Sequence, residues 1–408
     1  MIKIAKIIPG GQALATDKTG KKIFFWNALP GETVASYKVT KEKSHFTEAI
    51  ATNISEPSPS RTEPKDTCFL STSPWQIMNY DYELKLKTEL VVELFREHQI
   101  TIPLPKIFTD GKEFFYRNKM EYALYWNHAT NQIEPAFHMR GSHSKIPISH
   151  SSIERPELFE RAQQIIKELN DKKEEARKYQ SLLLRCNQKG DISGGLFENG
   201  KPHPHFPNLT DTILGHEFSY SPNGFFQINL PVYEMALTEI KRHINTKKVL
   251  DLYAGVGTIG LSVARNHHLT LVECDKSAFN ELANNIAIED ISRPTGSELA
   301  RSPVTTGATK RIRNGNIFAV LSKSEEALDF ITSDATVILD PPRAGCDSKL
   351  INRLLEVTPP IIIYLSCNPA TQARDVKALL EKYHIKEMKV FNFFPHTPHI
   401  ENLVVLSL

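Results

Sequence analysis

The sequence is poor in cysteine, and its few cysteines are not paired along the chain. Five occur among 408 residues, at positions 68, 186, 274, 346 and 367, with no C-x-x-C spacing. A zinc site or a disulfide framework is therefore not expected, and a reducing, cytoplasmic setting fits best. No run of 18 apolar residues occurs, and the first residues lack the apolar core of a signal peptide. We expect no membrane partner.

Charge of one sign is also lacking. The net charge is only +2, so a nucleic-acid partner would have to be met by a local basic patch. A hydrophobic content of 40% and a charged content of 24% are ordinary for a soluble globular enzyme. A chain of this length is long for a single core and predicts two or three domains.

Residues 1–60 predict a small all-β module. Short alternating runs at 3–8, 22–26, 33–39 and 47–54 are separated by glycine-containing turns. This spacing favours a five-stranded barrel of the OB type, whose faces often hold nucleic acid. Positive charge comes from Lys38, Lys41, Lys43 and Arg61. A β module without an RNA contact accounts for the pattern equally well.

Residues 61–210 predict a second, α+β domain. Helices are expected over 81–98 and 155–180, and strands over 115–125 and 181–186. The group YRNK at 116–119 combines an aromatic ring with two cations. A phosphate contact and an exposed strand edge are both compatible with it.

Residues 211–408 predict the domain that binds a cofactor. A strand at 249–253 leads through a glycine turn into a helix from 259. The turn satisfies G-x-G-x-x-G, with Gly255 as its first glycine, and a second strand ends at Glu273, where a carboxylate can bind ribose hydroxyls. Asp251 would face the ammonium group of S-adenosylmethionine but would repel a pyrophosphate. We therefore expect S-adenosylmethionine rather than a nicotinamide dinucleotide.

Two apolar runs near the end of the chain predict buried parallel strands with reactive tips. The runs at 337–339 and 361–365 end at Asp340 and shortly before Cys367; Asp340 is followed by Pro-Pro and Cys367 by Asn-Pro. Ligands bind outside the carboxyl ends of such strands. Either residue alone is more simply a turn carboxylate or a core thiol. Two such strand ends in series favour a reactive site.

A methyl donor, a thiol and a carboxylate together suggest a particular reaction. The C5 carbon of uracil is too weak a nucleophile to take a sulfonium methyl unaided. Addition of a thiolate to C6 makes C5 enolate-like, and a base must afterwards remove the C5 proton. Cys367 and Glu401 supply these two groups, and Glu401 stands just before a predicted buried strand at 403–406.

The chain resembles the RNA uracil-C5 methyltransferase family. Five motifs carry the resemblance: FFQxN at 225–229, DLYAGVG at 251–257, DPPRAG at 340–345, SCNPATxxRD at 366–375 and FPHTxHxE at 394–401. The segments GG at 10–11 and LPGE at 29–32 resemble the TRAM barrel of many members, and YRNK resembles a central-domain motif. The fold implied is α/β, a Rossmann-like class I methyltransferase domain with an N-terminal TRAM-like barrel and a central α+β domain.

The resemblance also implies roles for individual residues. Cys367 would be the nucleophile and Glu401 the base, while Phe225 and Arg343 would contact the substrate. The pocket for S-adenosylmethionine and the target base would be lined by Gln227, Tyr253, Gly255, Thr258, Glu273 and Asp340. The implied product is 5-methyluridine in structured RNA, with the base flipped into the site. The TRAM-like barrel favours 23S ribosomal RNA over transfer RNA and its uridine 54.

Two departures from the family pattern concern the iron–sulfur cluster and the adenine site. Many TRAM-bearing members hold a four-iron cluster on four cysteines, but here the segment 68–76 offers only Cys68 and the later position falls at 149–152. We expect no cluster. Asn316 stands where such folds commonly carry an acid near the adenine.

The insertion at 291–313 is rich in Ser, Thr, Gly, Pro and basic residues, which favours a mobile surface segment over an RNA-contacting arm. We expect a monomer without metal. Two other classes stay open: a nicotinamide-dependent oxidoreductase and a non-catalytic RNA-binding factor. A cofactor titration and a methyl-transfer assay separate them.

Overall fold

The computed structural model describes residues 1–203, 206–288 and 310–408. Its N-terminal part is a six-stranded sheet in the order β1-β5-β6-β4-β3-β2. The strands are β1 (Ile2–Lys3), β2 (Lys6–Ile7), β3 (Ala13–Thr16), β4 (Lys22–Trp26), β5 (Thr33–Glu42) and β6 (Phe46–Glu56). The expected number of five strands is wrong. The sequence does not predict β3, because its buried residues Ala13 and Ala15 have little β propensity.

The charge expected on this sheet is smaller than the sequence suggests. The Arg61 guanidinium binds the buried carboxylate of Glu32, with Nε 2.6 Å from Oε1 and Nη2 2.7 Å from Oε2. Arg61 is therefore paired within the protein. Lys38, Lys41 and Lys43 remain on the exposed part of β5 and the turn that follows it.

Two helices follow the N-terminal sheet, α1 (Phe69–Thr72) and α2 (Tyr80–Glu97). The bounds of α2 confirm the helix predicted over 81–98. Its start is fixed by Asn79, whose side chain accepts a hydrogen bond from the Tyr82 amide. α2 buries Leu86, Leu90 and Val91 against the rest of the protein.

The central part is a second six-stranded sheet in the order β10-β9-β8-β11-β12-β13. Its strands are β8 (Lys119–Asn127), β9 (Gln132–His138), β10 (Lys145–Pro147), β11 (Ser181–Cys186), β12 (Ile192–Glu198) and β13 (Lys201–His203), with α3 (Pro156–Asp171) against it. The helix predicted to 180 ends at Asp171, because Lys173 is left-handed (φ +56°); a short 3-10 turn, η1 (Ala176–Lys178), follows. The predicted strand at 115 begins only at Lys119, since Phe115 is also left-handed (φ +55°).

The C-terminal part is built on a nine-stranded sheet in the order β18-β19-β17-β16-β20-β21-β23-β22-β7. The strands are β7 (Lys106–Phe108), β16 (Lys248–Asp251), β17 (His268–Glu273), β18 (Arg311–Asn314), β19 (Ile317–Leu321), β20 (Ala335–Leu339), β21 (Ile361–Ser366), β22 (His384–Phe391) and β23 (Glu401–Ser407). The five from β19 to β21 are parallel, and β23 pairs antiparallel with β21. A separate hairpin, β14 (Leu209–Ile213) and β15 (His216–Tyr220), lies in the chain between β13 and the eight strands of this sheet other than β7.

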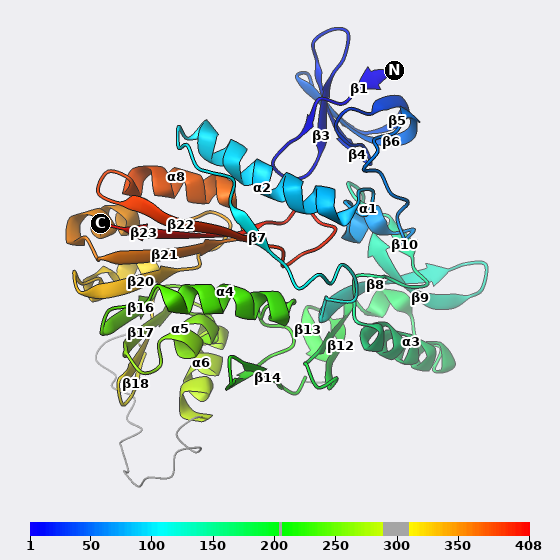
Figure 1. Cartoon of the computed structure of the whole chain (residues 1–408). Coiled ribbons are helices and arrows are strands. Elements are labelled where there is room, and N and C mark those ends of the chain that lie inside the picture. Colours follow the sequence, from blue (N-terminus) through cyan, green and yellow to red (C-terminus); the bar gives the residue numbers. More distant parts are fainter. Residues whose placement is uncertain (204–205, 289–309) are drawn as a thin grey trace.

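Helices cover both faces of this sheet. In Figure 1, α2 and α8 (Pro369–Leu379) lie on one face, and α4 (Leu230–Arg242), α5 (Thr258–Val263) and α6 (Lys276–Ile288) lie on the other. The remaining elements are α7 (Ser348–Val357) and the 3-10 turns η2 (Ser324–Glu326) and η3 (Leu328–Phe330). Alternate residues of one strand enter different cores: Ile362 packs on the α2–α8 side and Ile363 on the α4–α6 side. The core on the α2–α8 side continues into the N-terminal sheet.

The structure corrects the position of Asn316. This residue stands immediately before β19, at the amino end of a strand parallel to β17, and its side-chain amide donates to the carbonyls of Arg265 (2.9 Å) and His267. It lies at the opposite edge of the sheet from the glycine turn, so its expected place near the adenine is wrong. The corresponding carboxyl end of β19 is Leu321.

The insertion predicted at 291–313 falls mostly outside the described residues, which resume at 310. Its last three residues, 311–313, belong to β18 and pair with β19. The predicted end of the insertion is therefore wrong. In the described part of the chain, no helix combines the length and apolar character that crossing a membrane requires.

Candidate active site

The glycine turn after β16 has a backbone shape that only small residues allow. Gly257 has φ +92°, and a β-carbon there would lie 2.6 Å from Leu282 Cδ1. Gly255 is different, since a β-carbon there would meet no atom within 4 Å. Its amide donates to Glu273 Oε2 at 2.8 Å, which ties the turn to the end of β17. The turn is thus rigid and leaves open space beside Gly255, next to Glu273.

Carboxyl groups gather at the carboxyl edge of the sheet, where the parallel strands end. Asp251 is fully buried and accepts a hydrogen bond from the Gly260 amide at 3.0 Å. Burial, together with Glu273, raises the pKa of Asp251 to about 7. Burial and then Asp251 raise the pKa of Asp340 to about 7 as well. Negative charge is therefore disfavoured here in the free protein, because desolvation and mutual repulsion outweigh the available hydrogen bonds.

This electrostatic state tests which cofactor fits. Although the Tyr253 amide also favours the charged form of Asp251, Oδ1 of Asp251 makes no hydrogen bond of ordinary geometry within the described residues. A ligand with positive charge would relieve the repulsion, whereas a pyrophosphate would increase it. The residues present therefore fit a cationic ligand such as S-adenosylmethionine.

Cys367 and Glu401 meet at the ends of neighbouring strands. β21 and β23 pair Ser366 with Asn402, and the next positions in this register are Cys367 and Glu401. Burial raises the pKa of the Cys367 thiol to about 11, and Glu401 and Asp340 add to the rise, while Arg343 opposes it. The buried Glu401 carboxyl also has its pKa raised well above the usual value, by burial and then by Asp340. The Cys367 thiol is therefore protonated in the free protein at neutral pH, and burial favours the protonated form of Glu401.

Two motifs hold one another beside Cys367. The Asn368 side chain caps α8 by accepting from the Ala370 amide, and it donates to the Arg343 carbonyl at 2.8 Å. Thr371 Oγ1 donates to the same carbonyl at 3.1 Å. The Arg343 side chain is exposed, and its Nη2 lies 3.3 Å from His399 Nδ1. Arg343 is thus fixed by its backbone, with its guanidinium directed at the rim of the site.

The loop that carries FFQxN is supported from the central sheet. Arg185, fully buried, donates to the carbonyls of Gly224 (3.2 Å) and Phe226, and Lys119 Nζ donates to the Asn223 and Gly224 carbonyls at 3.1 Å each. Phe225 stands at the tip with 76% of its surface exposed. A rigid loop therefore presents one free aromatic ring.

The group YRNK does not form an exposed strand edge. Tyr116 and Asn118 are buried, and Asn118 Nδ2 lies 3.4 Å from the Gln227 carbonyl. Lys119 is used for loop carbonyls, as described above. The exposed-edge interpretation is wrong, because these side chains find their partners in loops more than 100 residues further along the chain.

The other expected residues lie around the same edge. Gln227 and Thr258 are buried, while the hydroxyl of Tyr253, which is partly exposed, lies beside Ser324 and Cys346. The sequence does not reveal Tyr233 of α4, because it reads as part of an apolar helix face. Burial, Asp340, Asp251 and Glu401 raise its pKa well above the usual value, so its hydroxyl belongs to the acidic cluster.

Residues of a polar network occupy the region around 66–76 and 149–152, where the family pattern would place the cysteines of an iron–sulfur cluster. Asp66 is buried and accepts from the Ser152 hydroxyl at 2.7 Å and from Gln76 Nε2 at 2.7 Å. The Ser73 hydroxyl accepts from Gln76 Nε2, also at 2.7 Å. Burial raises the pKa of the Cys68 thiol to about 12. Within residues 1–203, 206–288 and 310–408, no group of three or more His, Cys, Asp or Glu side chains is arranged to hold a metal ion.

Comparisons with known proteins show what the chain is similar to. Residues 210–408 match the family model described as tRNA (Uracil-5-)-methyltransferase. A relative from Enterococcus faecalis, called an uncharacterized RNA methyltransferase, is 27% identical over 94% of this chain and 92% of its own. One of the same description from Staphylococcus aureus is 28% identical over 95% and 93%.

A solved structure shares the fold over the whole chain. The Pyrococcus abyssi tRNA (uracil-54, C5)-methyltransferase, in complex with S-adenosyl-L-homocysteine, has a TM-score of 0.74 and 22% identity and covers 100% of both chains. The fold is therefore mixed α/β, with an N-terminal β-rich sheet and a methyltransferase domain. The family match spans every motif from FFQxN to the end of the chain, and the protein is an S-adenosylmethionine-dependent RNA uracil-5 methyltransferase.

Proposed function

We propose that the protein forms 5-methyluridine in structured RNA through a covalent bond between Cys367 and the target base. The observation that carries this proposal is the register of β21 and β23, which places Cys367 and Glu401 at neighbouring strand ends. A nucleophile and a base are both required on one uracil ring, at adjacent carbons. Two strand ends in one sheet satisfy that requirement with rigid supports.

The Cys367 thiolate adds to C6 of the uracil, and the electron pair of the C5=C6 bond moves to C5 and the O4 carbonyl as an enolate. S-adenosylmethionine supplies an electrophilic methyl group when bound. Once C5 carries both the methyl group and its original proton, the Glu401 carboxylate removes that proton. The C5=C6 double bond re-forms, the bond from C6 to Sγ breaks, and Cys367 leaves as a thiolate.

The resting protonation states set a condition on this chemistry. The raised pKa of Cys367 keeps its thiol neutral in the free enzyme, and burial and Asp340 favour the neutral form of Glu401. Binding of a cationic ligand beside Asp340 would favour the ionised forms of nearby acids. The site is thus activated by occupancy and stays unreactive when empty.

We assign the cofactor to the glycine turn and the acidic cluster. Asp251, Glu273 and the open space at Gly255 would hold it, with Gln227, Tyr253, Thr258 and Asp340 around it. Phe225 and Arg343 would contact the RNA, the first by stacking on a base. Residues 1–60 would add a TRAM-like RNA-binding surface, residues 61–210 would support the loops, and residues 211–408 would carry out the reaction.

For the RNA itself, the resemblance of the N-terminal sheet to a TRAM barrel favours ribosomal RNA, most simply 23S. Transfer RNA is the second candidate, because the Pyrococcus abyssi enzyme, which shares the fold from end to end, acts on uridine 54 of tRNA. The deciding experiment maps 5-methyluridine in both RNAs from a strain lacking this gene and from the same strain with the gene restored. Loss of one site in ribosomal RNA is expected. Loss only in transfer RNA selects the second candidate, and no loss in either removes the proposal.

A further inference from the structure

The segment 392–400 joins β22 to β23 and ends at the proposed base, Glu401. It contains no helix or strand, so its backbone groups must find partners elsewhere. Four successive carbonyls accept hydrogen bonds from four different parts of the chain: Phe393 from Asn229 Nδ2 (3.2 Å), Phe394 from Lys87 Nζ (3.0 Å), Pro395 from the Tyr116 hydroxyl (2.9 Å) and His396 from the Trp75 amide (3.0 Å). The segment has a few internal hydrogen bonds around Thr397, but these four carbonyls are held from outside it.

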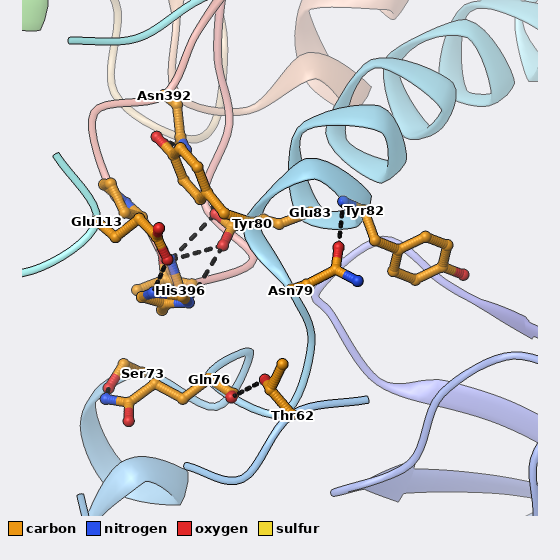
Figure 2. Close-up of polar contacts among 12 residues, drawn as sticks. Thr62, Ser73, Gln76, Asn79, Tyr80, Tyr82, Glu83, Glu113, Asn392 and His396 are labelled. Atoms are coloured by element: carbon orange, nitrogen blue, oxygen red, sulfur yellow. Dashed lines mark hydrogen bonds and ion pairs between the residues drawn. The ribbon is translucent and has the colours of Figure 1, made fainter. Parts of the chain in front are cut away.

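The strongest of these supports is an ion pair in α2. Glu83 and Lys87 lie 2.8 Å apart, one helical turn from each other, and both side chains are completely buried. Glu83 accepts the His396 amide on both carboxylate oxygens, at 3.0 and 2.9 Å, and Lys87 donates to Asn392 Oδ1 at 2.6 Å. Figure 2 shows Glu83 reaching from α2 to His396 beside Asn392. Charged partners make hydrogen bonds about twice as strong as neutral ones.

The pair is poorly explained by stability alone. Burying two charges carries a desolvation cost that well-packed apolar residues would avoid. Besides the ion pair between them, the side chains of Glu83 and Lys87 make hydrogen bonds to residues 392, 394 and 396. His396 is also held in the left-handed region, at φ +59°, which is strained for a residue other than glycine. The pair thus fixes an unfavourable turn a few residues before Glu401.

We propose that Glu83 and Lys87 are positioning residues that place Glu401 for removal of the C5 proton. Both residues lie outside 210–408, the part that matches the family model. Cys367 is held from other elements, at the junction of β21 and α8, by Asn368 and its partners, and the segment reaches it only indirectly, through His399 and Arg343. Loosening the segment should slow proton removal more than the earlier addition of the thiolate. The proposal rests on the covalent mechanism given above.

The test is the double variant Glu83→Gln/Lys87→Met, which removes both charges together and leaves no unpaired buried ion. We expect kcat to fall about ten- to a hundredfold, with the KM for S-adenosylmethionine unchanged. We also expect an RNA–protein adduct that survives denaturing electrophoresis, because the methylated intermediate accumulates. A role in folding alone would not produce that adduct. The matched control is Lys85→Met/Glu89→Gln, an exposed pair on the same helix at 3.7 Å, which should behave as wild type.

Unchanged kcat in the double variant, or a lower kcat without adduct, overturns the proposal. If the double variant does not fold, Tyr116→Phe is tested instead, since it deletes only the hydroxyl that donates to the Pro395 carbonyl of the same segment. The same adduct is expected. Unchanged kcat without an adduct would contradict the proposal. Glu401→Gln is run in parallel. If Glu401→Gln gives the adduct but neither the double variant nor Tyr116→Phe does, the positioning role is rejected and the covalent mechanism is not. Normal turnover by Glu401→Gln rejects the mechanism itself.

Discussion

Gly11 of the N-terminal region lies directly against Pro398, three residues before Glu401. A β-carbon at Gly11 would lie 2.7 Å from Pro398 Cγ and closer still to Pro398 Cβ. The Gly11 carbonyl also accepts a hydrogen bond from the Trp75 indole at 3.0 Å. The N-terminal sheet therefore packs against the segment that carries the proposed base.

Replacing Gly11 by alanine should disturb that segment. The rigid Pro398 ring must shift, so we expect Gly11→Ala to lower methyl transfer about tenfold or more. Gly20→Ala is the matched control, because Gly20 has a similar φ (+88° against +94°) but no atom within 4 Å of its β-carbon position. It should lose about 1 kcal/mol of stability through backbone strain alone and keep its activity. Equal activity of the two variants would argue against the contact.

The Cys367 thiol should react slowly in the free enzyme. A thiolate is the reactive form, and a pKa near 11 leaves very little of it at pH 7. In a Cys274→Ser background, which removes the exposed thiol, alkylation of Cys367 by iodoacetamide should rise about tenfold for each pH unit from 7 to 9. Arg343→Gln should slow it further, because Arg343 favours the thiolate. A rate that is already maximal at pH 7 contradicts the assigned electrostatics.

Binding of S-adenosylmethionine should release protons. Asp251 and Asp340 have pKa values of about 7, so a fraction of each is protonated at pH 6.5. A cationic ligand favours the ionised carboxylates and lowers these pKa values, so affinity should increase from pH 6 to 7.5. Calorimetry in buffers of different ionisation enthalpy measures the release. Asp251→Asn should reduce it and weaken binding, while Asp334→Asn, on the exposed surface, serves as control.

Protein purified without air should be colourless and free of iron, because a four-iron cluster is normally held by four thiolates. An absorbance band at about 400 nm, with about four irons per chain, would contradict this. The network around Asp66 should stabilise the protein instead. Asp66→Ala leaves its buried donors unpaired and should lower the free energy of unfolding by about 2–3 kcal/mol, as measured by chemical denaturation. Exposed Asp81→Ala on the first turn of α2 should have a smaller effect.

The sequence predicts the parts of the site that depend on local pattern. Asp340 and the strand before Cys367 follow from short apolar runs that stop at proline, and the glycine turn follows from its spacing. The sequence predicts Asn316 at the wrong end of a strand. The insertion before it makes the start of β19 unpredictable from the spacing, and Asn316 in fact precedes that strand. Glu83 and Lys87 read as the polar side of an amphipathic helix. Their burial depends on a segment about 310 residues away, which no local pattern reports.

The same limit applies to Arg185 and Lys119. In the sequence they are charged residues in or beside strands, and nothing indicates that they donate hydrogen bonds to backbone carbonyls of a distant loop. Only the fold brings the loop at 223–227 onto the central sheet and gives these cations their acceptors. The sequence thus predicts the chemistry of the site, while the side chains that hold its loops can be identified only from long-range packing.

The most direct test of the covalent mechanism is mass spectrometry of the Glu401→Gln variant incubated with substrate RNA and S-adenosylmethionine. Because an amide cannot take the C5 proton, the reaction should stop after methyl transfer with the RNA still attached. After nuclease and protease digestion, the peptide containing Cys367 should carry one methylated uridine nucleotide. Cys367→Ala in the same background should carry none, while still binding the cofactor. A nucleotide attached to any other residue, or methyl transfer by Cys367→Ala at more than a small fraction of the wild-type rate, would contradict the mechanism.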